Sequence, residues 1–366
     1  MKKHLSEEAW MSRAIALARH GLGQTRPNPP VGAIIVRNGR AVGQGWHRRA
    51  GTDHAEIVAL KDAGRRARGA TLYVTLEPCS TSGKTPPCTS AILANGVTRV
   101  VIATRDPNPR HNGRGIGILR RAGVHVTEGV REEEGRALVA PFSKWVTTGM
   151  PYVTLKLGTS IDGRISDLNG KSRWITSEES RSLVKKLRGE VDAVLVGSAT
   201  ALLDNPSLLP AECSRSKPFR IVVSARGGLL LSNKIFSDGK SAQTIIATTR
   251  RCPSPVADAL GRTGAAIWHL PEKHGRVSLK PLLAEMGRRG ILHVLCEGGG
   301  ALAESMVREG LVDEVLFIVA PLILGGTTST AAIGGHGWQL ALAPKLEFTD
   351  VRRIGADILV RGKCRG

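Results

Sequence analysis

One imidazole, one carboxylate and two thiols lie close together in the first quarter of the sequence, as His54, Glu56, Cys79 and Cys88. An imidazole and two thiolates make three protein ligands for tetrahedral zinc and leave the fourth position to water. Zinc lowers the pKa of a bound water towards about 7, and Glu56 is close enough to His54 in the chain to take that proton without being a ligand. The pattern predicts a catalytic zinc centre with His54, Cys79 and Cys88 as ligands and Glu56 as the general acid–base.

The spacing of these residues indicates which kind of zinc site they form. His54 and Cys88 fall near predicted helix starts, where the positive helix end and the metal favour thiolate over thiol. A non-catalytic zinc clip is the alternative, but a closed site normally needs a fourth protein ligand, and the neighbouring sequence offers no obvious one. His-x-Glu followed by Pro-Cys and a second Cys is typical of zinc-dependent nucleobase deaminases. Here Ser80–Pro87 separates the cysteines in place of two residues, and we expect this longer loop to lie beside the pocket and shape it.

A second candidate site follows the predicted buried strand His293–Cys296, which leads into Glu297-Gly298-Gly299-Gly300 and then a helix. Such a junction lets a phosphate approach backbone N–H groups at a helix start, although glycine serves a plain tight turn as well. Lys156 either approaches a phosphate or caps a strand. His47 either faces a substrate phosphate or lies at a solvated strand end. The residues alone leave these alternatives open.

The elements that would position the zinc site alternate between helix and strand. The predicted helices span residues 7–20, 54–66, 115–122 and 131–148, and another begins near Thr89. The predicted strands span residues 31–36, 40–46, 71–76, 99–103 and 124–127. Asn38-Gly39 is a hairpin turn signal between the first two strands. This order predicts a layered α/β sheet opened by a hairpin.

Gly149-Met150-Pro151 breaks the helix at 131–148 and divides the sequence into a first domain, residues 1–148, and a second, residues 149–366. A second sheet is predicted, with strands at 152–157, 191–196, 219–224, 243–248, 291–296, 314–319 and 356–361. The Gly-Ser-Pro-rich stretch at 204–218 is expected to be a loop.

The composition limits the classes of binding partner that we expect for this protein. The net charge of +21 attracts anionic partners, whether nucleic acid, membrane surfaces or phosphorylated metabolites. The basic residues form only short groups without a run of five or six like charges, and aromatic residues make up 4% of the chain. Both facts argue against a dedicated nucleic-acid arm or a base-stacking surface. A generally basic, solvated surface is the simplest interpretation.

The first residues and the cysteines favour a cytoplasmic protein. The sequence begins MKKHLSEE, with no apolar segment after the lysines, and no apolar stretch reaches membrane-spanning length. Six cysteines in a chain of this size do not suggest a disulfide framework. Cys213, Cys252, Cys296 and Cys364 lack metal spacing and are expected to pack or to lie at the surface. We therefore expect a reducing cytoplasm and no membrane partner.

Several short motifs run along nearly the whole chain. In the first half they are Pro27-Asn28-Pro29, His54-Ala55-Glu56, Thr75–Ser80, Gly83–Cys88 and Asp106–Pro109. In the second half they are Leu155–Gly158, Ser160–Arg164, Ser172–Ser177 and Glu297–Gly299. With these motifs, in this order, the sequence resembles the bifunctional deaminase–reductases of riboflavin biosynthesis.

The resemblance implies two folds and two consecutive reactions. The N-terminal domain would be a cytidine-deaminase-like three-layer α/β/α domain. It would hydrolyse the 2-amino group of 2,5-diamino-6-ribosylamino-4(3H)-pyrimidinone 5′-phosphate. The C-terminal domain would be a dihydrofolate-reductase-like α/β domain that uses NADPH to reduce the ribosyl side chain to a ribityl chain. Hydride transfer needs little from the protein beyond positioning, since the cofactor carries the chemistry.

The resemblance also implies site residues, with Zn²⁺ and NADPH as cofactors. The NADPH site would be lined by Gly158, Trp174, Thr200, Asp204, Gly298, Gly299, Gly300 and Ala301. The phosphorylated substrate would contact Ser172, Arg188, Leu208 and Glu297. In the first domain Asn28 is expected to hydrogen-bond the pyrimidine, with a structural Pro-Asn-Pro turn as the alternative.

Some positions depart from the family pattern. Thr81-Ser82 stands where the family usually has histidine. The family's Asp-Asp-Pro, followed shortly by a substrate arginine, is replaced by Asp204-Asn205-Pro206 and a following stretch that ends in Ala211. Ser224-Ala225 stands where an Asp-Ser pair often ends the next strand. Loss of a carboxylate and of a bidentate donor is not conservative, so these departures bear mainly on the reductase.

Two other functions would keep the zinc site and change the second domain. An RNA-editing-type deaminase would hold RNA there, and its binding would weaken steeply between low and moderate salt. The glycine-rich junction and scarce aromatics argue against it. A deaminase with an inactive, scaffold-like reductase domain is suggested by Asn205 and the missing arginine, and NADPH oxidation would decide. We expect a phosphorylated pyrimidine substrate, no nucleic-acid partner and a homo-oligomer.

Overall fold

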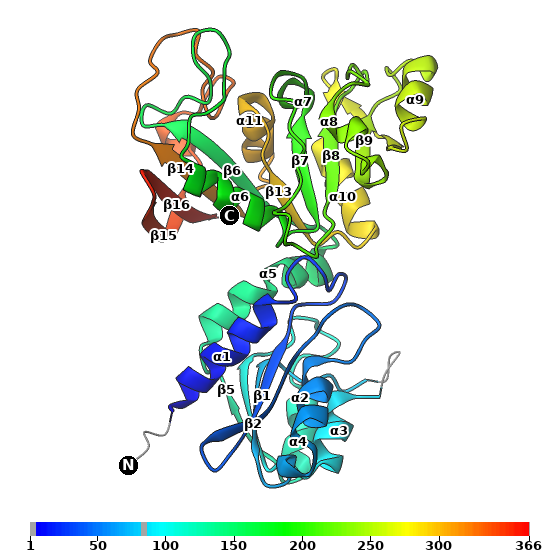
Figure 1. The fold of residues 1–366 in the computed structure, drawn as a ribbon, viewed down its shortest axis with the longest axis vertical. Helices are drawn as coiled ribbons and strands as arrows, with labels where there is room; N and C mark the ends of the chain where they lie inside the picture. The colour runs from blue at the N-terminus through cyan, green and yellow to red at the C-terminus, as the bar shows by residue number, and fades with distance from the viewer. Residues whose placement is uncertain (1–4, 82–85, 366) are drawn as a thin grey trace. The chain divides into compact units, whose positions relative to one another are not determined.

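The structure of this chain is a computed structural model that describes residues 5–81 and 86–365. The chain divides into two compact units between Gly149 and Met150 (Figure 1). Each unit has its own sheet and its own buried apolar clusters. Each unit therefore contains the core that an independent domain needs.

The first unit is built on a five-stranded sheet in the order β2-β1-β3-β4-β5. The strands are β1 (Gly32–Arg37), β2 (Arg40–Trp46), β3 (Thr71–Leu76), β4 (Arg99–Thr104) and β5 (His125–Glu128). β1 pairs antiparallel with β2 and β3, whereas β3, β4 and β5 are parallel. Asn38 and Gly39 both have positive φ, as a two-residue hairpin of this kind requires. The carboxyl ends of β3 and β4 consequently meet at one edge of the sheet.

Helices cover both faces of this sheet. They are α1 (Glu7–Arg19), α2 (Ala55–Ala63), α3 (Cys88–Ala94), α4 (Arg114–Arg121) and α5 (Glu132–Thr148). Ala33 and Ile35 of β1 belong to the apolar cluster shared with α2, α3 and α4. Ile34 and Val36 belong to the cluster shared with α1. Since successive side chains of a strand point to opposite faces, both faces are buried, and the predicted three-layer α/β/α architecture is confirmed.

The second unit contains a nine-stranded sheet in the order β10-β9-β8-β7-β13-β6-β14-β16-β15. Its strands are β6 (Tyr152–Ser160), β7 (Ala193–Gly197), β8 (Phe219–Val223), β9 (Thr244–Thr248), β10 (Ala266–His269), β13 (His293–Cys296), β14 (Glu314–Ala320), β15 (Leu346–Ile354) and β16 (Asp357–Cys364). The strands from β10 to β14 along the sheet are all parallel, and β16 and β15 add antiparallel strands at one edge. The loops that follow the parallel strands therefore gather at a single edge, the usual place for a binding site in such a sheet.

Helices again lie on both faces. They are α6 (Glu178–Arg188), α7 (Ser198–Leu203), α8 (Lys234–Ser237), α9 (Ser254–Gly261), α10 (Leu279–Arg288) and α11 (Gly300–Arg308). One apolar cluster joins Leu195 of β7 to Met286 of α10 and Met306 of α11. Another joins Val194 of β7 to Ala201 of α7 and Leu260 of α9. A small separate hairpin, β11 (Glu272–Lys273) and β12 (Arg276–Val277), connects β10 to α10.

Most predicted elements are confirmed, but one helix limit is wrong and several short or exposed strands were not predicted. The helix expected to reach Arg66 ends at Ala63, because Gly64 adopts a positive φ and a short 3₁₀ turn follows. The strands β10 and β15 and the β11–β12 hairpin were not predicted. β10 and β15 are edge strands, and β15 has mostly exposed side chains, so its residues show neither a buried run nor a clean alternation. The expected loop at 204–218 contains no helix or strand after α7.

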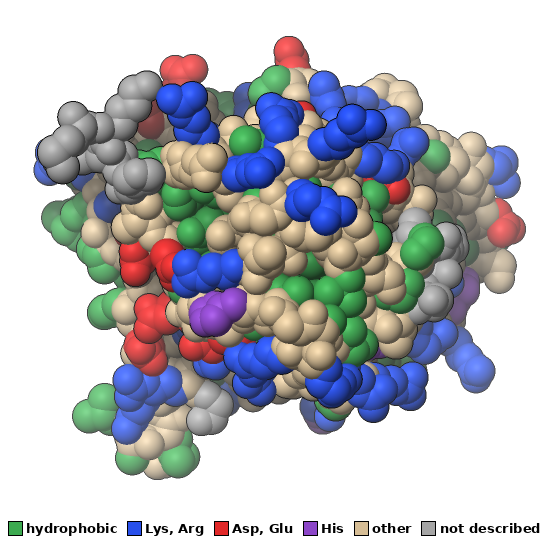
Figure 2. All heavy atoms as spheres, turned by 90° about the horizontal axis from the view of Figure 1, so that it is seen from below, with side chains coloured by type: hydrophobic (Ala, Val, Ile, Leu, Met, Phe, Trp, Pro, Cys, Tyr) green, Lys and Arg blue, Asp and Glu red, His purple; other side chains and the backbone are tan. Residues whose placement is uncertain are grey.

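The charged side chains on the surface of the described residues agree with the basic composition of the chain. In Figure 2, Lys and Arg side chains lie in several separate groups, and Asp and Glu side chains lie among them on one side. No helix within the described ranges is long and apolar enough to cross a membrane.

Candidate functional site

The structure brings the three predicted zinc ligands together from three elements of the first unit. His54 is the N-cap of α2, Cys79 follows β3, and Cys88 is the first residue of α3. The Nδ1 atom of His54 lies 3.2 Å from the Cys88 sulfur and 3.6 Å from the Cys79 sulfur. The backbone N–H of Cys88 also donates to the Cys79 sulfur, at 3.3 Å. The prediction that His54, Cys79 and Cys88 lie close together is therefore confirmed.

The geometry of this cluster fits zinc. Its three ligand atoms lie within 4.8 Å of one another, and within the described part of the chain no other group of His, Cys, Asp and Glu satisfies the same criterion. Zinc bonds of about 2.3 Å to sulfur and 2.0 Å to nitrogen at tetrahedral angles require an N–S separation of about 3.5 Å. The two observed separations are close to this value. Three protein ligands, with one position left over, suit a catalytic rather than a closed structural site.

Glu56 lies beside this cluster in the first turn of α2 and is only 3% exposed. Burial, together with the negative charge of the Cys79 sulfur, raises the pKa of the Glu56 carboxyl to about 7. Hydrogen bonds from Cys88 and His54 lower the pKa of Cys79. The site thus provides a thiolate ligand and a carboxyl group suited to exchange a proton near neutral pH.

His47 and Asn28 form a second polar pair next to the ligands. The His47 ring packs edge-on against the His54 ring at 5.3 Å between centroids and is 2% exposed, so the alternative of a solvated strand end is wrong. Its Nδ1 lies 3.1 Å from the Asp53 carbonyl, and its Nε2 lies 3.0 Å from the Asn28 amide nitrogen. Nδ1–H therefore donates and Nε2 accepts, in a neutral ring, and burial lowers the pKa of His47 accordingly. This bond fixes Asn28 with its amide oxygen left to accept from a ligand.

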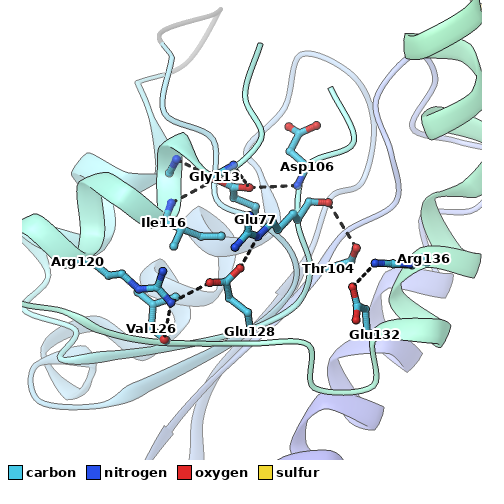
Figure 3. Close-up of polar contacts among 12 residues, drawn as sticks. Glu77, Thr104, Asp106, Gly113, Ile116, Arg120, Val126, Glu128, Glu132 and Arg136 are labelled. Carbon is cyan, nitrogen blue, oxygen red and sulfur yellow. Dashed lines mark hydrogen bonds and ion pairs between the residues drawn. The ribbon is translucent and has the colours of Figure 1, made fainter. Parts of the chain in front are cut away.

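Glu77 has a positioning role that the sequence did not reveal (Figure 3). Its carboxylate is 4% exposed and lies two residues before Cys79. One oxygen accepts from the backbone N–H of Asp106 and Gly113, at 3.2 and 2.9 Å. The other accepts from Gly115 and Ile116 at the start of α4, at 2.9 and 3.3 Å. The segment that carries Cys79 is thereby tied to the loop after β4, and the only sequence signal was the place of Glu77 before Pro78-Cys79.

The loop between the two cysteines is described only at its ends. Ser80, Thr81, Pro86 and Pro87 belong to the described residues, and Thr81 is exposed. Residues 82–85 lie outside them, so the expectation that the long loop shapes the pocket stays a prediction.

In the second unit, a cavity of about 1110 Å³ opens at the edge where the parallel strands end. Six of the predicted residues line it: Ser172, Thr200, Asp204, Gly299, Gly300 and Ala301. The predicted strand–glycine–helix junction is present, since β13 ends at Cys296 and α11 begins at Gly300. A Cβ on Gly300 would lie 2.4 Å from the Ala331 carbonyl oxygen, so the close backbone approach at this helix start requires glycine.

Three predicted cofactor residues are not among those that line the cavity. Gly158 lies in β6, where a Cβ would meet Thr176 at 3.1 Å. Trp174 is 68% exposed and lies against the Arg181 guanidinium, 4.6 Å from its ring centroid. A Cβ on Gly298 would meet the side chain of Leu302 at 2.6 Å. Their roles in cofactor binding stay predictions.

Two of the predicted substrate residues, Arg188 and Glu297, form an ion-pair network with Lys156. Arg188 donates to both oxygens of Glu297, at 2.6 and 3.0 Å, and the Lys156 ammonium lies 3.6 Å from the same carboxylate. Burial opposes ionisation of Glu297, but these two cations overcome it and lower its pKa to about 2. Glu297 is therefore an ionised acceptor, and Lys156 pairs with it instead of capping a strand. The hydroxyl of Ser172 contacts Asp204.

The residues at the departures from the family pattern have local structural partners. Asn205 has a positive φ, and its side-chain oxygen accepts from the backbone N–H of Lys234 at 2.7 Å, at the start of α8. Leu208 also has a positive φ and is 1% exposed. The Ala211 backbone N–H donates to the Lys185 carbonyl. Asn205 thus connects two segments of this unit.

Comparisons with known proteins match each unit to a family model. Residues 5–104 match the model described as the cytidine and deoxycytidylate deaminase zinc-binding region. Residues 151–360 match the model described as the RibD C-terminal domain.

Similar full-length proteins cover both units. The riboflavin biosynthesis protein RibD of Aquifex aeolicus is 39% identical over 358 residues, which span 97% of each chain. RibD of Escherichia coli is 38% identical over 97% of this chain and 98% of its own. A solved structure of Acinetobacter baumannii RibD superposes with a TM-score of 0.86 at 35% identity, covering 98% of this chain and 99% of that one. A diaminohydroxyphosphoribosylaminopyrimidine deaminase/5-amino-6-(5-phosphoribosylamino)uracil reductase from Thermotoga maritima gives 0.84 at 34% identity, covering 98% of both chains.

Proposed function

This chain belongs to the RibD family of bifunctional riboflavin biosynthesis proteins, and we propose how its residues divide the two reactions. Residues 1–148 deaminate 2,5-diamino-6-ribosylamino-4(3H)-pyrimidinone 5′-phosphate. Residues 149–366 then reduce the ribosyl side chain with NADPH. The observation that carries the proposal is the convergence of His54, Cys79 and Cys88 within 4.8 Å beside the buried Glu56.

In the deamination, His54, Cys79 and Cys88 hold zinc, which when bound supplies the Lewis acid that activates the attacking water. Glu56 accepts a proton from that water and returns protons to the ring nitrogen and to the leaving amine. The amidine carbon thereby gains oxygen and loses ammonia. The raised pKa of Glu56 supports both steps, since a group that titrates near neutral pH can accept and donate.

Asn28 orients the pyrimidine in this proposal. Its amide nitrogen is committed to His47 Nε2, so its oxygen is the atom left to accept a hydrogen bond from the substrate. His47 in turn is held by the Asp53 carbonyl, which fixes the tautomer that accepts from Asn28. This chain of contacts supports substrate binding by Asn28 over a purely structural turn.

In the reduction, NADPH supplies the hydride when bound, and the chain positions it. The backbone N–H groups of Gly299, Gly300 and Ala301 at the start of α11 suit a pyrophosphate, because a helix start offers free donors and a positive dipole end. Thr200 and Asp204 line the same cavity from α7 and its C-cap. We propose that Gly158, Trp174 and Gly298 complete the cofactor site.

Ser172, Arg188, Leu208 and Glu297 would position the ribotide substrate. The ionised Glu297, held by Arg188 and Lys156, can accept from sugar hydroxyl groups. Ser172 joins this region to the cofactor cavity through Asp204. These contacts support a working reductase over a scaffold, since an ion-pair network and an open cavity are both present where the substrate and cofactor residues were predicted.

We also propose that the enzyme acts as a cytoplasmic homo-oligomer without a nucleic-acid partner. All six cysteines are free, and a reducing compartment would keep the two zinc thiolates available. The edge strand β15 exposes Phe348 and Val351 at 67% and 60%, an apolar edge of the kind that a second copy covers. The basic residues form short groups along the sequence without a run of five or six like charges, which argues against a dedicated nucleic-acid arm.

The deciding experiment supplies the diaminopyrimidine ribotide with NADPH and identifies the product by mass. Loss of the amino group followed by gain of two hydrogens supports the proposal. Ammonia release without NADPH oxidation would favour the scaffold-like reductase instead. Tight RNA retention that collapses between low and moderate salt would favour an RNA-directed deaminase, and light scattering would test the oligomer.

A further inference from the structure

The strand order of the second unit defines the two ends of its cavity. The cavity is lined by segments that follow the parallel strands. Ser166 and Thr330, which follow β6 and β14, lie at one end, and Gly299, which follows β13, lies in the middle. Ala225 and Arg276, which follow β8 and β10, lie at the other end. β6 and β8 are three strand spacings apart, or about 14 Å at ~4.8 Å per spacing.

An extended dinucleotide would follow this order, a step that rests on the proposed function. Its pyrophosphate belongs at the α11 start, in the middle of the cavity. Its nicotinamide must lie next to the ribotide, and of the proposed ribotide contacts Ser172 follows β6 and Glu297 pairs with Lys156 of β6. Its adenosine half therefore extends towards β8 and the β11–β12 hairpin.

The hairpin end of the cavity is the basic end. Four cationic and two anionic side chains line it: Lys273, Arg276, Lys280 and Arg308, with Glu304 and Glu309. The opposite end is lined by the uncharged residues Ile165, Ser166, Gly170, Ser172 and Thr330, and the charged residue next to them in the lining is the acidic Asp204, which contacts Ser172. The cavity is thus polarised along the direction in which the dinucleotide would lie, with the positive charge on the adenosine side.

Two of these cations are left without a protein partner. Lys273 pairs with Glu309 at 3.4 Å, and Arg308 pairs with Glu304. Arg276 and Lys280 make no ion pair and no side-chain hydrogen bond with any residue that the structure describes. Two uncompensated cations in a concave lining suit an anionic ligand group.

The hairpin that carries Arg276 is itself anchored. The Arg251 guanidinium pairs with Glu272 of β11 at 3.4 Å, and the Thr249 hydroxyl donates to the same carboxylate at 3.4 Å. Both partners lie just after β9, so the hairpin is fixed to the sheet edge next to the cavity. Ala225, which lines this end after β8, offers no side-chain donor that could replace the hairpin cations.

We propose that Arg276 and Lys280 bind the 2′-phosphate of NADPH and select it over NADH. NADPH differs from NADH only by this phosphate, so selection must arise where the phosphate lies. A guanidinium presents paired donors to phosphate oxygens, and an ammonium adds a compact charge. The subsite is therefore an adenosine 2′-phosphate site formed by the β11–β12 hairpin and the first turn of α10.

The test is calorimetric titration of the full zinc-loaded chain with adenosine 2′,5′-bisphosphate, adenosine 5′-monophosphate, NADPH and NADH. The double variant Arg276→Ala/Lys280→Ala should bind the bisphosphate and NADPH about 10- to 100-fold more weakly, because each contact to a charged group is worth about tenfold. Its affinities for the monophosphate and NADH should not change. The matched control Lys234→Ala/Arg262→Ala removes the same charge from exposed positions outside the cavity and should match the wild type.

Two results would overturn this assignment alone. The double variant could keep the wild-type preference for the bisphosphate, or it could lose the monophosphate and NADH to the same extent. In either case NADPH binding by the wild type would still support the proposed reductase. Failure of the wild type to bind NADPH at all would instead remove the proposed function and this inference together. Arg276→Glu/Lys280→Glu provides the converse check, since it should bind NADH better than NADPH.

Discussion

Glu56 is a buried carboxyl next to two sulfur ligands but is not one of the residues that fit the metal. We expect Glu56→Gln to retain zinc and to lower ammonia release by about 10²- to 10⁴-fold, the usual worth of a general acid–base. Elemental analysis and an ammonia assay measure both quantities. Glu128→Gln is a matched control, since that carboxyl pairs with Arg105 and Arg120 away from the ligands. Zinc loss in Glu56→Gln, or a near-normal rate, would contradict the assigned role.

His293 makes the stability of the second unit depend on pH. Burial lowers its pKa to about 4, and the nearby Arg361 charge adds to the effect. The folded pKa is below the unfolded value of about 6.5, so this stability is complete above pH 6.5 and is lost as the pH falls towards 4. Between pH 6.5 and 5 the loss is about 2 kcal/mol, at 1.36 kcal/mol per unit.

The replacement His293→Gln tests whether His293 causes this loss of stability at low pH. A neutral amide can still bond to Thr154, whose hydroxyl lies 3.0 Å from the His293 Nε2 atom. Urea unfolding of the second unit at pH 6.5 and pH 5 should therefore give a smaller difference for the variant than for the wild type. Equal pH dependence in the two chains would show that another group is responsible.

At the scale of elements, Glu77 connects the strand that carries Cys79 to the start of α4. Its carboxylate accepts from four backbone N–H groups (Figure 3). Glu77→Gln replaces one acceptor oxygen by an NH₂ group, which leaves buried donors unpaired. We expect it to lower the free energy of unfolding of the first unit by about 2–4 kcal/mol. Urea unfolding measures this loss, and hydrogen exchange should quicken at Gly113 and Ile116; unchanged protection there would refute the connection.

Two glycines of α4 offer a matched pair of substitutions. A Cβ on Gly115 would lie 2.1 Å from the backbone oxygen of Pro78, which precedes Cys79, whereas a Cβ on Gly117 meets only the flexible end of Arg121 at 3.3 Å. Gly115→Ala should therefore destabilise the first unit by at least about 1–3 kcal/mol and weaken zinc retention. Gly117→Ala should be neutral or stabilising by up to about 1 kcal/mol, since alanine favours helix. Similar melting temperatures for both variants would contradict the argument.

Sequence periodicity predicted the elements whose burial is regular. Strands β3 and β4 are apolar runs with both faces covered, so their limits were predicted to within a residue. The edge strand β15 could not be predicted, because its partner β16 supplies its register while its own side chains are mostly exposed. The helix at α2 was predicted too long because the positive φ of Gly64 terminates it before a short 3₁₀ turn.

The cluster of His54, Cys79 and Cys88 was predictable from residue types and spacing, but the contacts around it were not. His47 and Asn28 meet only because the β1–β2 hairpin returns the chain to the segment that follows Pro27, and no local pattern encodes that distance. Likewise Arg276 lines the cavity of the second unit because of the order of strands in the sheet, which is a long-range property. Local residues therefore specify the chemistry, whereas the topology determines which distant residues assist it.

At the scale of the whole molecule, the two proposed reactions belong to units with separate apolar cores, and the three proposed zinc ligands lie in the first. Removal of zinc by 1,10-phenanthroline should therefore abolish ammonia release and lower the melting temperature of the first unit, since metal binding stabilises the domain that contains the site. NADPH oxidation with the deaminated intermediate should continue, because none of its proposed residues contacts the ligands. Restored ammonia release on addition of zinc is the control, and parallel loss of both activities would instead mean that the second unit depends on the folded state of the first.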